Sequence, residues 1–130
     1  MKYKEFYISD VNGKSNCIIR TFSKLFNKNY EQIQNELIEI SKKLGYNNYV
    51  EIEVFEDYLK TNNYSIINKD NDIKIKDLEL DSGSYAIFCY DKKDYYHMVP
   101  IINNVVYDKS NECMDLYTIK IYKELNNKQK

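Results

Sequence analysis

The residues best suited to chemistry in this chain are Cys17 and His97, a thiol early in the sequence and the single histidine. A cysteine thiolate is a strong nucleophile, but a thiol with an ordinary pKa of ~8.5 needs a base or a cationic partner to ionise at neutral pH. An imidazole can supply both functions. The pair therefore predicts attack by sulfur on an acyl carbonyl, provided that the fold brings the two side chains together.

Cys17 opens a segment whose apolar spacing predicts a helix over residues 17–26, with an N-cap offered by Ser15-Asn16. At about 100° per residue, Cys17 falls on the side opposite the apolar stripe, together with Arg20 and Lys24. The free backbone N–H groups of a first helical turn favour an anion. This position therefore favours the thiolate over the thiol.

His97 lies in the first of two apolar strands that are joined by Asn103 and Asn104, a pair able to take the positive φ angles of a tight turn. A two-residue loop fixes the register, and strand alternation then places His97 and Asp108 on one face of the sheet as diagonal neighbours. A carboxylate at that position can orient the imidazole and stabilise its protonated form. Pro100 would lie at a hydrogen-bonded position of this hairpin without an N–H to donate, so the register requires a bulge or an edge strand.

Two further helices and a series of strands must surround these residues. Asn29 caps a helix that ends at Gly45, and a third helix is predicted over residues 50–59. Apolar runs typical of strands follow at residues 85–90, 95–102, 105–108 and 116–122, whereas residues 68–77 fit either an exposed hairpin arm or a loop. This order predicts an α+β domain, with N-terminal helices packed on a C-terminal antiparallel sheet.

Length and composition narrow the class of protein. The 130 residues fit a single domain over residues 1–130, with residues 126–130 expected to form a frayed tail. The net charge of −1 comes from interspersed charges, which disfavours nucleic acid as a partner. No apolar run resembles a signal peptide or a membrane span, so we expect a cytoplasmic protein without a membrane partner.

A metal site is a weaker interpretation of the same residues. Cys17, Cys89, Cys113 and His97 match the number of ligands in a zinc site. Structural zinc sites usually contain closely spaced ligand pairs, and none is present here. We therefore expect no metal and no cofactor.

The residues around the thiol and the histidine resemble the papain-like cysteine peptidase superfamily, and more closely small phage-encoded papain-like proteins and bacteriocin-processing peptidase domains. The resemblance rests on a helix that opens with Asn16 and Cys17, and on the strand around His97 with Asp108 eleven residues later. It implies a papain-like fold in which Cys17 is the nucleophile, His97 the general base and acid, and Asp108 the orienting carboxylate.

The resemblance also implies an oxyanion-hole amide, commonly Gln in this superfamily, a few residues before the cysteine. Asn12 is the nearest equivalent and Asn16 is a second candidate, with the backbone N–H of Cys17 as the other donor. Arg20 could bind a substrate carboxylate or pair with an acidic residue of the sheet. Tyr96 could line a peptide groove or serve in packing.

The leading functional prediction is a thiol hydrolase that cleaves a peptide, isopeptide or related acyl bond in a protein or peptide substrate. The alternative is a non-catalytic phage or mobile-element protein that uses the same fold to bind and inhibit a host protein. A thiol acyltransferase or deamidase would use the same residues and differ in what attacks the acyl-enzyme. The substrate and the oligomeric state stay open.

Overall fold

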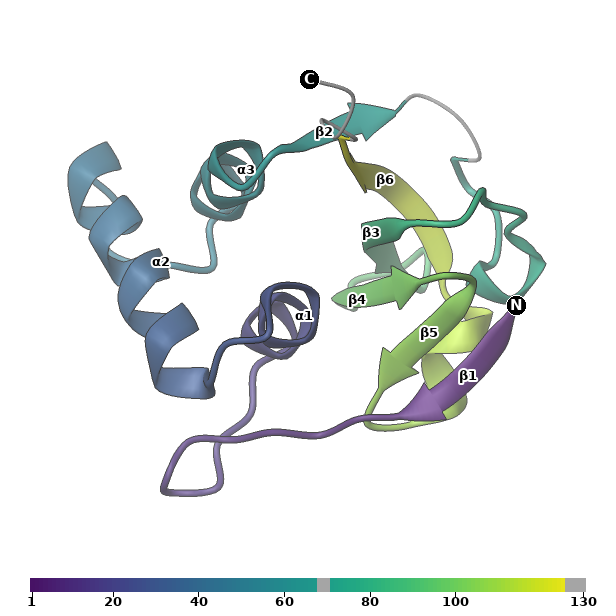
Figure 1. The fold of residues 1–130 in the computed structure, drawn as a ribbon, viewed down its shortest axis with the longest axis horizontal. Helices are drawn as coiled ribbons and strands as arrows, with labels where there is room; N and C mark the ends of the chain where they lie inside the picture. Colours follow the sequence, from purple (N-terminus) through teal and green to yellow (C-terminus); the bar gives the residue numbers. More distant parts are fainter. Residues whose placement is uncertain (68–70, 126–130) are drawn as a thin grey trace.

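The fold is an open sheet with helices on one side (Figure 1). The computed structural model describes residues 1–67 and 71–125. In chain order, their elements are β1 (Lys2–Glu5), α1 (Cys17–Phe26), α2 (Tyr30–Leu44), α3 (Ile52–Thr61), β2 (Tyr64–Ile67), the 3₁₀ turn η1 (Ile75–Asp77), β3 (Ser84–Tyr90), β4 (Tyr96–Ile102), β5 (Val105–Asp108), the 3₁₀ turn η2 (Asn111–Asp115) and β6 (Tyr117–Glu124). The strands form one sheet in the order β1-β5-β4-β3-β6-β2.

The α+β class is confirmed, but the prediction of a purely antiparallel sheet was wrong at one edge. Strand β1 pairs with β5 in parallel, with Lys2 opposite Val105 and Glu5 opposite Asp108. The sequence reasoning missed β1 because this short edge strand is polar, exposed over most of its length and lacks an apolar run. Strand β2, which pairs antiparallel with β6, was also missed. The sheet is therefore mixed.

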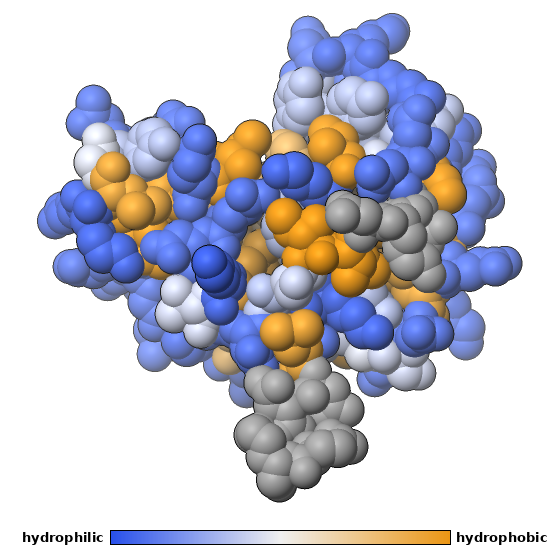
Figure 2. All heavy atoms as spheres, turned by 90° about the horizontal axis from the view of Figure 1, so that it is seen from above, coloured by the Kyte–Doolittle hydropathy of each residue, from blue (hydrophilic) through white to orange (hydrophobic). Residues whose placement is uncertain are grey.

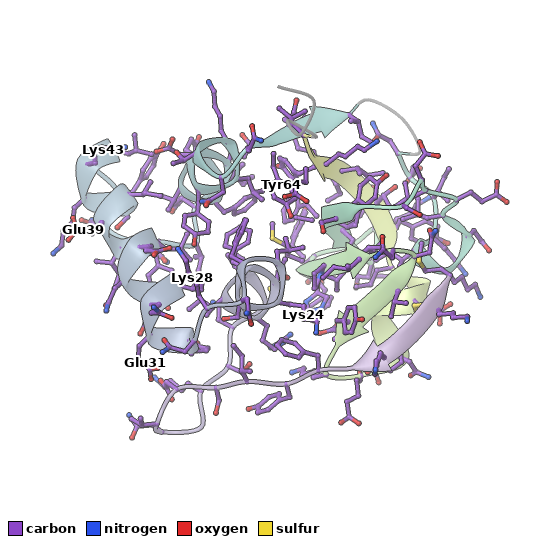
Figure 3. All side chains as sticks on the ribbon, in the orientation of Figure 1. Lys24, Lys28, Glu31, Glu39, Lys43 and Tyr64 are labelled. Carbon is purple, nitrogen blue, oxygen red and sulfur yellow. The ribbon has the colours of Figure 1, made fainter. Side chains whose placement is uncertain are left out.

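The predicted helices form close to their predicted bounds. Asn16 caps α1 by accepting hydrogen bonds from the backbone N–H groups of Ile18 and Ile19. Helix α2 has a capping box at Asn29 and ends at Gly45, which adopts a positive φ of 86° that suits glycine. Helix α3 begins and ends two residues later than predicted. On α2, the labelled side chains of Glu39 and Lys43 point away from the sheet (Figure 3).

Helix α1 is enclosed on both sides. Its apolar stripe, including the fully buried Phe22, packs in the core that the helices share. The opposite side faces strands β4 and β5: the Thr21 hydroxyl donates to the carbonyl of Met98 at 3.1 Å, and Arg20 is only 4% exposed. Lys24 lies over the ring of Tyr107 at 4.2 Å. The polar side of α1 is therefore directed at the sheet.

Both faces of the sheet are covered by apolar packing. Met98 packs toward the helices, whereas its strand neighbour Val99 packs in a second core that includes Cys113 of η2. Viewed from the side of α3 and β2, the surface is mostly hydrophilic with some apolar side chains gathered near its centre (Figure 2). No helix among the described residues is long and apolar enough to cross a membrane.

The β4–β5 hairpin has the predicted turn and register. Asn103 and Asn104 have φ angles of 49° and 66°, and the pairs Ile102–Val105 and Ile101–Val106 form. The ladder between the two strands covers only these pairs, after which β5 continues beside β1. Pro100 therefore needs no bond to β5, which resolves the difficulty raised by its missing N–H.

The segment from 68 to 77, for which the sequence left two possibilities, is described only from residue 71. Lys74 forms an isolated bridge with Tyr117 and is followed by η1, so the described part is an irregular connection and no hairpin arm. Residues 68–70 and the expected tail at residues 126–130 lie outside the described residues.

Candidate active site

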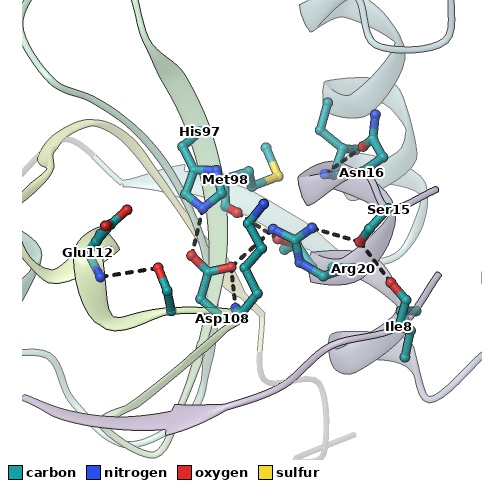
Figure 4. A network of polar contacts seen from close by, with 12 residues as sticks. Ile8, Ser15, Asn16, Arg20, His97, Met98, Asp108 and Glu112 are labelled. Carbon is teal, nitrogen blue, oxygen red and sulfur yellow. Dashed lines mark hydrogen bonds and ion pairs between the residues drawn. The ribbon is translucent and has the colours of Figure 1, made fainter. Parts of the chain in front are cut away.

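A chain of buried polar contacts runs from the sheet to the start of α1 (Figure 4). His97 Nε2 lies 2.7 Å from Asp108 Oδ2, and the other carboxylate oxygen accepts from Arg20 at 3.1 Å. The Arg20 guanidinium also donates to the Ser15 hydroxyl at 2.8 Å, and that hydroxyl donates to the carbonyl of Ile8 at 2.7 Å. His97, Asp108 and Arg20 are each at most 5% exposed. The carboxylate is thus held from both sides.

Cys17 completes this arrangement from the helix side. Its side chain lines the same pocket as His97, and the two side chains shift one another's pKa. Nε2 of the imidazole faces Asp108, and the Tyr95 hydroxyl lies 3.3 Å from the other ring nitrogen, Nδ1. The bond between Thr21 and Met98 anchors α1 to β4 beside this pocket. The structure therefore brings Cys17, His97 and Asp108 together in one continuous array.

The array shifts the proton affinities of its members in opposite directions. Burial by itself would raise the pKa of the Cys17 thiol, but the hydrogen bond with His97 and the charge of that ring lower it below its ordinary value. Burial opposes protonation of His97, yet its hydrogen bonds to Asp108 and then to Cys17 raise its pKa to about 9. For Asp108, burial is outweighed by His97, and the carboxyl pKa is lowered.

These directions favour an ion pair. The lowered pKa of the thiol and the pKa of the imidazole, raised to about 9, both act to move the proton from sulfur to the ring, which would leave a thiolate beside an imidazolium. Asp108 then faces a positive ring on one oxygen and a positive guanidinium on the other. The arrangement can perform nucleophilic attack by sulfur with a proton donor held beside it.

The two oxyanion candidates lie in different surroundings. Asn12 is exposed on a turn, where its backbone N–H donates to Asp10. Asn16 lies beside Cys17 in the wall of a pocket. Its Oδ1 caps α1, whereas its Nδ2 makes no hydrogen bond within the described ranges. Asn16 is therefore the candidate with a free donor next to the sulfur.

The structure also places the two candidates for substrate contact. Arg20 is in the buried ion pair with Asp108, the second of the two roles that the sequence suggested for it. Tyr96 is 53% exposed and lines the same pocket as Cys17 and His97. Its ring stacks on Phe88 at 5.8 Å. Of these two residues, only Tyr96 lies where a substrate could touch it.

The sequence indicates Tyr95, beside His97, only as a tyrosine that could line a groove or serve in packing, and predicts no contact with the imidazole. Its hydroxyl lies 3.3 Å from His97 Nδ1, and its ring stacks on the imidazole with a centroid separation of 5.6 Å. Alternation along a strand puts residues i and i+2 on one face, so the spacing of Tyr95 and His97 carried the signal. Tyr95 is half exposed and shields one face of the buried ring from solvent.

Two pockets meet at His97. One, of about 290 Å³, is mostly apolar and has Cys17 in its wall. The other, of about 180 Å³, lies on the Asp108 side and contains the charged residues Lys109 and Glu112. The imidazole therefore lies between an apolar cavity, which has the nucleophile in its wall, and a cavity with charged residues in its wall.

Among the described residues, no group of three or more His, Cys, Asp or Glu side chains is arranged as a metal site.

Comparison of the chain with models of protein families, with curated proteins and with solved structures found no match. The chemistry of the site is therefore the basis for proposing a function.

Proposed function

We propose that this protein is a papain-like thiol hydrolase that cleaves a peptide, isopeptide or related acyl bond through Cys17, His97 and Asp108. The observation that carries the proposal is the buried pair of His97 and Asp108, 2.7 Å apart, together with Cys17 in the wall of the pocket that His97 also lines. The opposite pKa directions of the thiol and the imidazole support the same role. The order Cys, His, Asp along the chain agrees with the papain-like resemblance.

In the proposed first step, the Cys17 thiolate attacks the acyl carbonyl and a sulfur–carbon bond forms. The carbonyl π electrons move to oxygen, where the Cys17 backbone N–H and Asn16 Nδ2 can donate to the negative charge. When the intermediate collapses, the bond to the leaving group breaks and His97 Nδ1 gives that group its proton. The acyl part stays on the sulfur.

The second step restores the starting state. His97 is now neutral, and its unprotonated Nδ1, which lies 3.3 Å from the Tyr95 hydroxyl, takes a proton from water, whose oxygen attacks the thioester carbonyl. Collapse of this intermediate breaks the sulfur–carbon bond and releases a carboxylic acid. Asp108 accepts the hydrogen bond from Nε2 throughout, which fixes the ring and stabilises its protonated form.

The test combines alkylation with acylation. Iodoacetamide alkylation of Cys17, located by mass spectrometry between pH 5 and 9, should proceed well below pH 7, because a thiolate paired with His97 is already ionised there. A p-nitrophenyl ester should give a burst of one nitrophenolate per chain. Both signals should disappear in Cys17→Ala, while circular dichroism shows that the variant is folded.

His97→Gln is the second variant, because Gln has a similar volume but cannot titrate. The pH dependence of Cys17 alkylation should then move to a midpoint near or above ~8.5, the ordinary value for a thiol. An ester burst that persists in Cys17→Ala would rule out this mechanism. A wild-type alkylation midpoint near 8.5 with no burst would instead favour the non-catalytic binding protein.

A further inference from the structure

The pocket beside Cys17 has a chemical character that bears on the substrate. It measures about 290 Å³ and lies between the start of α1, the N-terminal half of α3 and the strands β3 and β4. Its apolar walls are formed by Ile18, Val50, Ile52, Phe55, Phe88 and Met98. Among the described residues that line it, none is Asp, Glu, Lys or Arg.

One wall of the pocket is aromatic and fixed by packing. The rings of Phe55 and Phe88 lie 5.5 Å apart, and Phe88 stacks in turn on Tyr96. Phe55 is 1% exposed, so its position is set by the core, whereas Ile52 at the mouth is 41% exposed. A preformed concave apolar surface of this kind binds apolar groups, since away from Cys17 and His97 a charged group would lose its hydration there without a partner.

Cys17 and His97 both line the pocket, so a group bound there lies next to the reacting bond. In the proposed reaction the leaving group takes the proton of His97, whereas the acyl part remains bonded to Cys17 Sγ. A group that fills the pocket is therefore a substituent close to the scissile bond, on the acyl part or on the leaving group. The charged residues Lys109 and Glu112 line the other pocket, behind the imidazole.

We propose that this pocket binds an uncharged apolar group, aromatic or branched aliphatic, next to the scissile bond. The proposal rests on the proposed function for the presence of that bond. The pocket selects against substituents that are charged or as small as glycine at this position. An aromatic group would add edge or offset contacts with Phe55 and Phe88.

The experiment uses two probes that differ only in an apolar group, iodoacetamide and N-phenethyl iodoacetamide. Each reacts by displacement of iodide by the thiolate, and mass spectrometry of the peptide that contains Cys17 gives the rate constant at that residue. Rates are measured at pH 9, where an ordinary thiol is largely ionised as well, and are divided by the rates with glutathione. This ratio separates the effect of the pocket on the alkylation rate from the effect of thiol ionisation.

The normalised rate for the phenethyl probe should exceed that for iodoacetamide on the order of 10-fold, the scale at which apolar pockets discriminate. Ile52→Ser should reduce this preference several-fold. Ile66→Ser is the matched control, because Ile66 is 43% exposed but lies on β2, in a different pocket, and it should leave the preference unchanged. The proposal would be overturned if Cys17 preferred the phenethyl probe no more than glutathione does. It would also be overturned if Ile52→Ser left the preference of Cys17 unchanged.

Failure of this inference can be distinguished from failure of the proposed function. If Cys17 behaves as an ordinary thiol below pH 7 but prefers the phenethyl probe at pH 9, the pocket is supported and the hydrolase mechanism is not. If Cys17 is activated but shows no preference, the mechanism is supported and the apolar specificity is overturned.

Discussion

At the scale of single residues, the Asp108 carboxylate links the two halves of the chain. One oxygen binds the imidazole of β4 and the other binds the Arg20 guanidinium of α1. Both partners are buried, so the loss of either would leave charge in a place with little water. Removing one member of a buried ion pair is far more costly than removing one member of an exposed pair.

Arg20→Met should therefore lower the free energy of unfolding by about 3 kcal/mol, because Asp108 keeps its charge but loses a buried partner. Urea unfolding followed by circular dichroism measures this change. Lys28→Met is the control, since Lys28 pairs with Glu36 at 2.9 Å in a half-exposed position. It should cost at most about 1 kcal/mol. Equal losses in the two variants would contradict the buried role of Arg20.

Asn16 allows capping and catalysis to be separated. Asp caps helices as well as Asn does, so Asn16→Asp should change the free energy of unfolding by less than about 0.5 kcal/mol. It lacks the Nδ2 donor, so ester turnover should fall on the order of 10²–10³-fold, the usual effect of losing one oxyanion donor. The alkylation rate of Cys17 at pH 9 checks that the thiol itself stays reactive.

Asn12→Ala provides the comparison for the oxyanion assignment. Asn12 is exposed on a turn and does not line the pocket of Cys17, so turnover should stay close to that of the unchanged protein. A large loss in Asn12→Ala, together with a small one in Asn16→Asp, would reverse the assignment.

At the scale of elements, the parallel strand β1 supports the strand that carries Asp108. The Tyr3 hydroxyl donates to the backbone carbonyl of Asp108 at 2.7 Å, and the Phe6 N–H donates to the same oxygen at 2.8 Å. These bonds hold the backbone of Asp108 where β5 no longer pairs with β4. Strand β1 thus takes over a supporting role that β4 provides elsewhere in the hairpin.

Tyr3→Phe should lower the free energy of unfolding by about 1 kcal/mol through the loss of one hydrogen bond. Tyr7→Phe removes an exposed hydroxyl that donates to the carbonyl of Gly13 at 3.3 Å, and it should cost much less. Urea midpoints of the two variants give the comparison. If both variants unfold at the same urea concentration, the Tyr3 bond contributes nothing particular to β5.

The same elements show what sequence patterns can and cannot predict. Helix α1, its Asn16 cap and the Asn103-Asn104 turn follow from local rules, and the structure contains all three. Strand β1 could not be predicted, because its pairing depends on a partner about 100 residues away and its own residues are polar. The link from Arg20 to Asp108 was one of two possibilities in the sequence, since only the packing of α1 on the sheet decides between them.

At the scale of the whole molecule, the Cys17–His97 pair predicts an unusual pH dependence of stability. The pKa of His97, raised to about 9, makes the folded chain bind a proton that the unfolded chain loses above about pH 6.5. The lowered pKa of the Cys17 thiol has the opposite effect, because the folded chain releases a proton that the unfolded thiol still holds. The pair should therefore contribute a free energy that changes less with pH than the contribution of His97 alone.

Cys17→Ala removes the opposing contribution of the thiol. The hydrogen bond and charge of Asp108 still act to raise the pKa of His97, which favours a folded state that binds a proton where the unfolded state releases it, above about pH 6.5. The stabilisation is complete below that pH and is lost as the pH rises through the folded pKa of His97. Urea unfolding at pH 6, 7, 8 and 9 should show a steeper decline for Cys17→Ala than for the unchanged protein. Parallel curves would contradict the proton exchange.

The pairing of Lys2 with Val105 joins residues that the ribosome synthesises about 100 residues apart, so the site can form only late in synthesis. The sulfur is synthesised early, but its imidazole, the carboxylate and the partner of β1 emerge about 80 to 100 residues later. Closing such distant contacts is slow compared with forming a helix. In a nascent chain, Cys17 is therefore an ordinary thiol. The proposed activation of this thiol by His97 and Asp108 would begin only once β5 had joined the sheet.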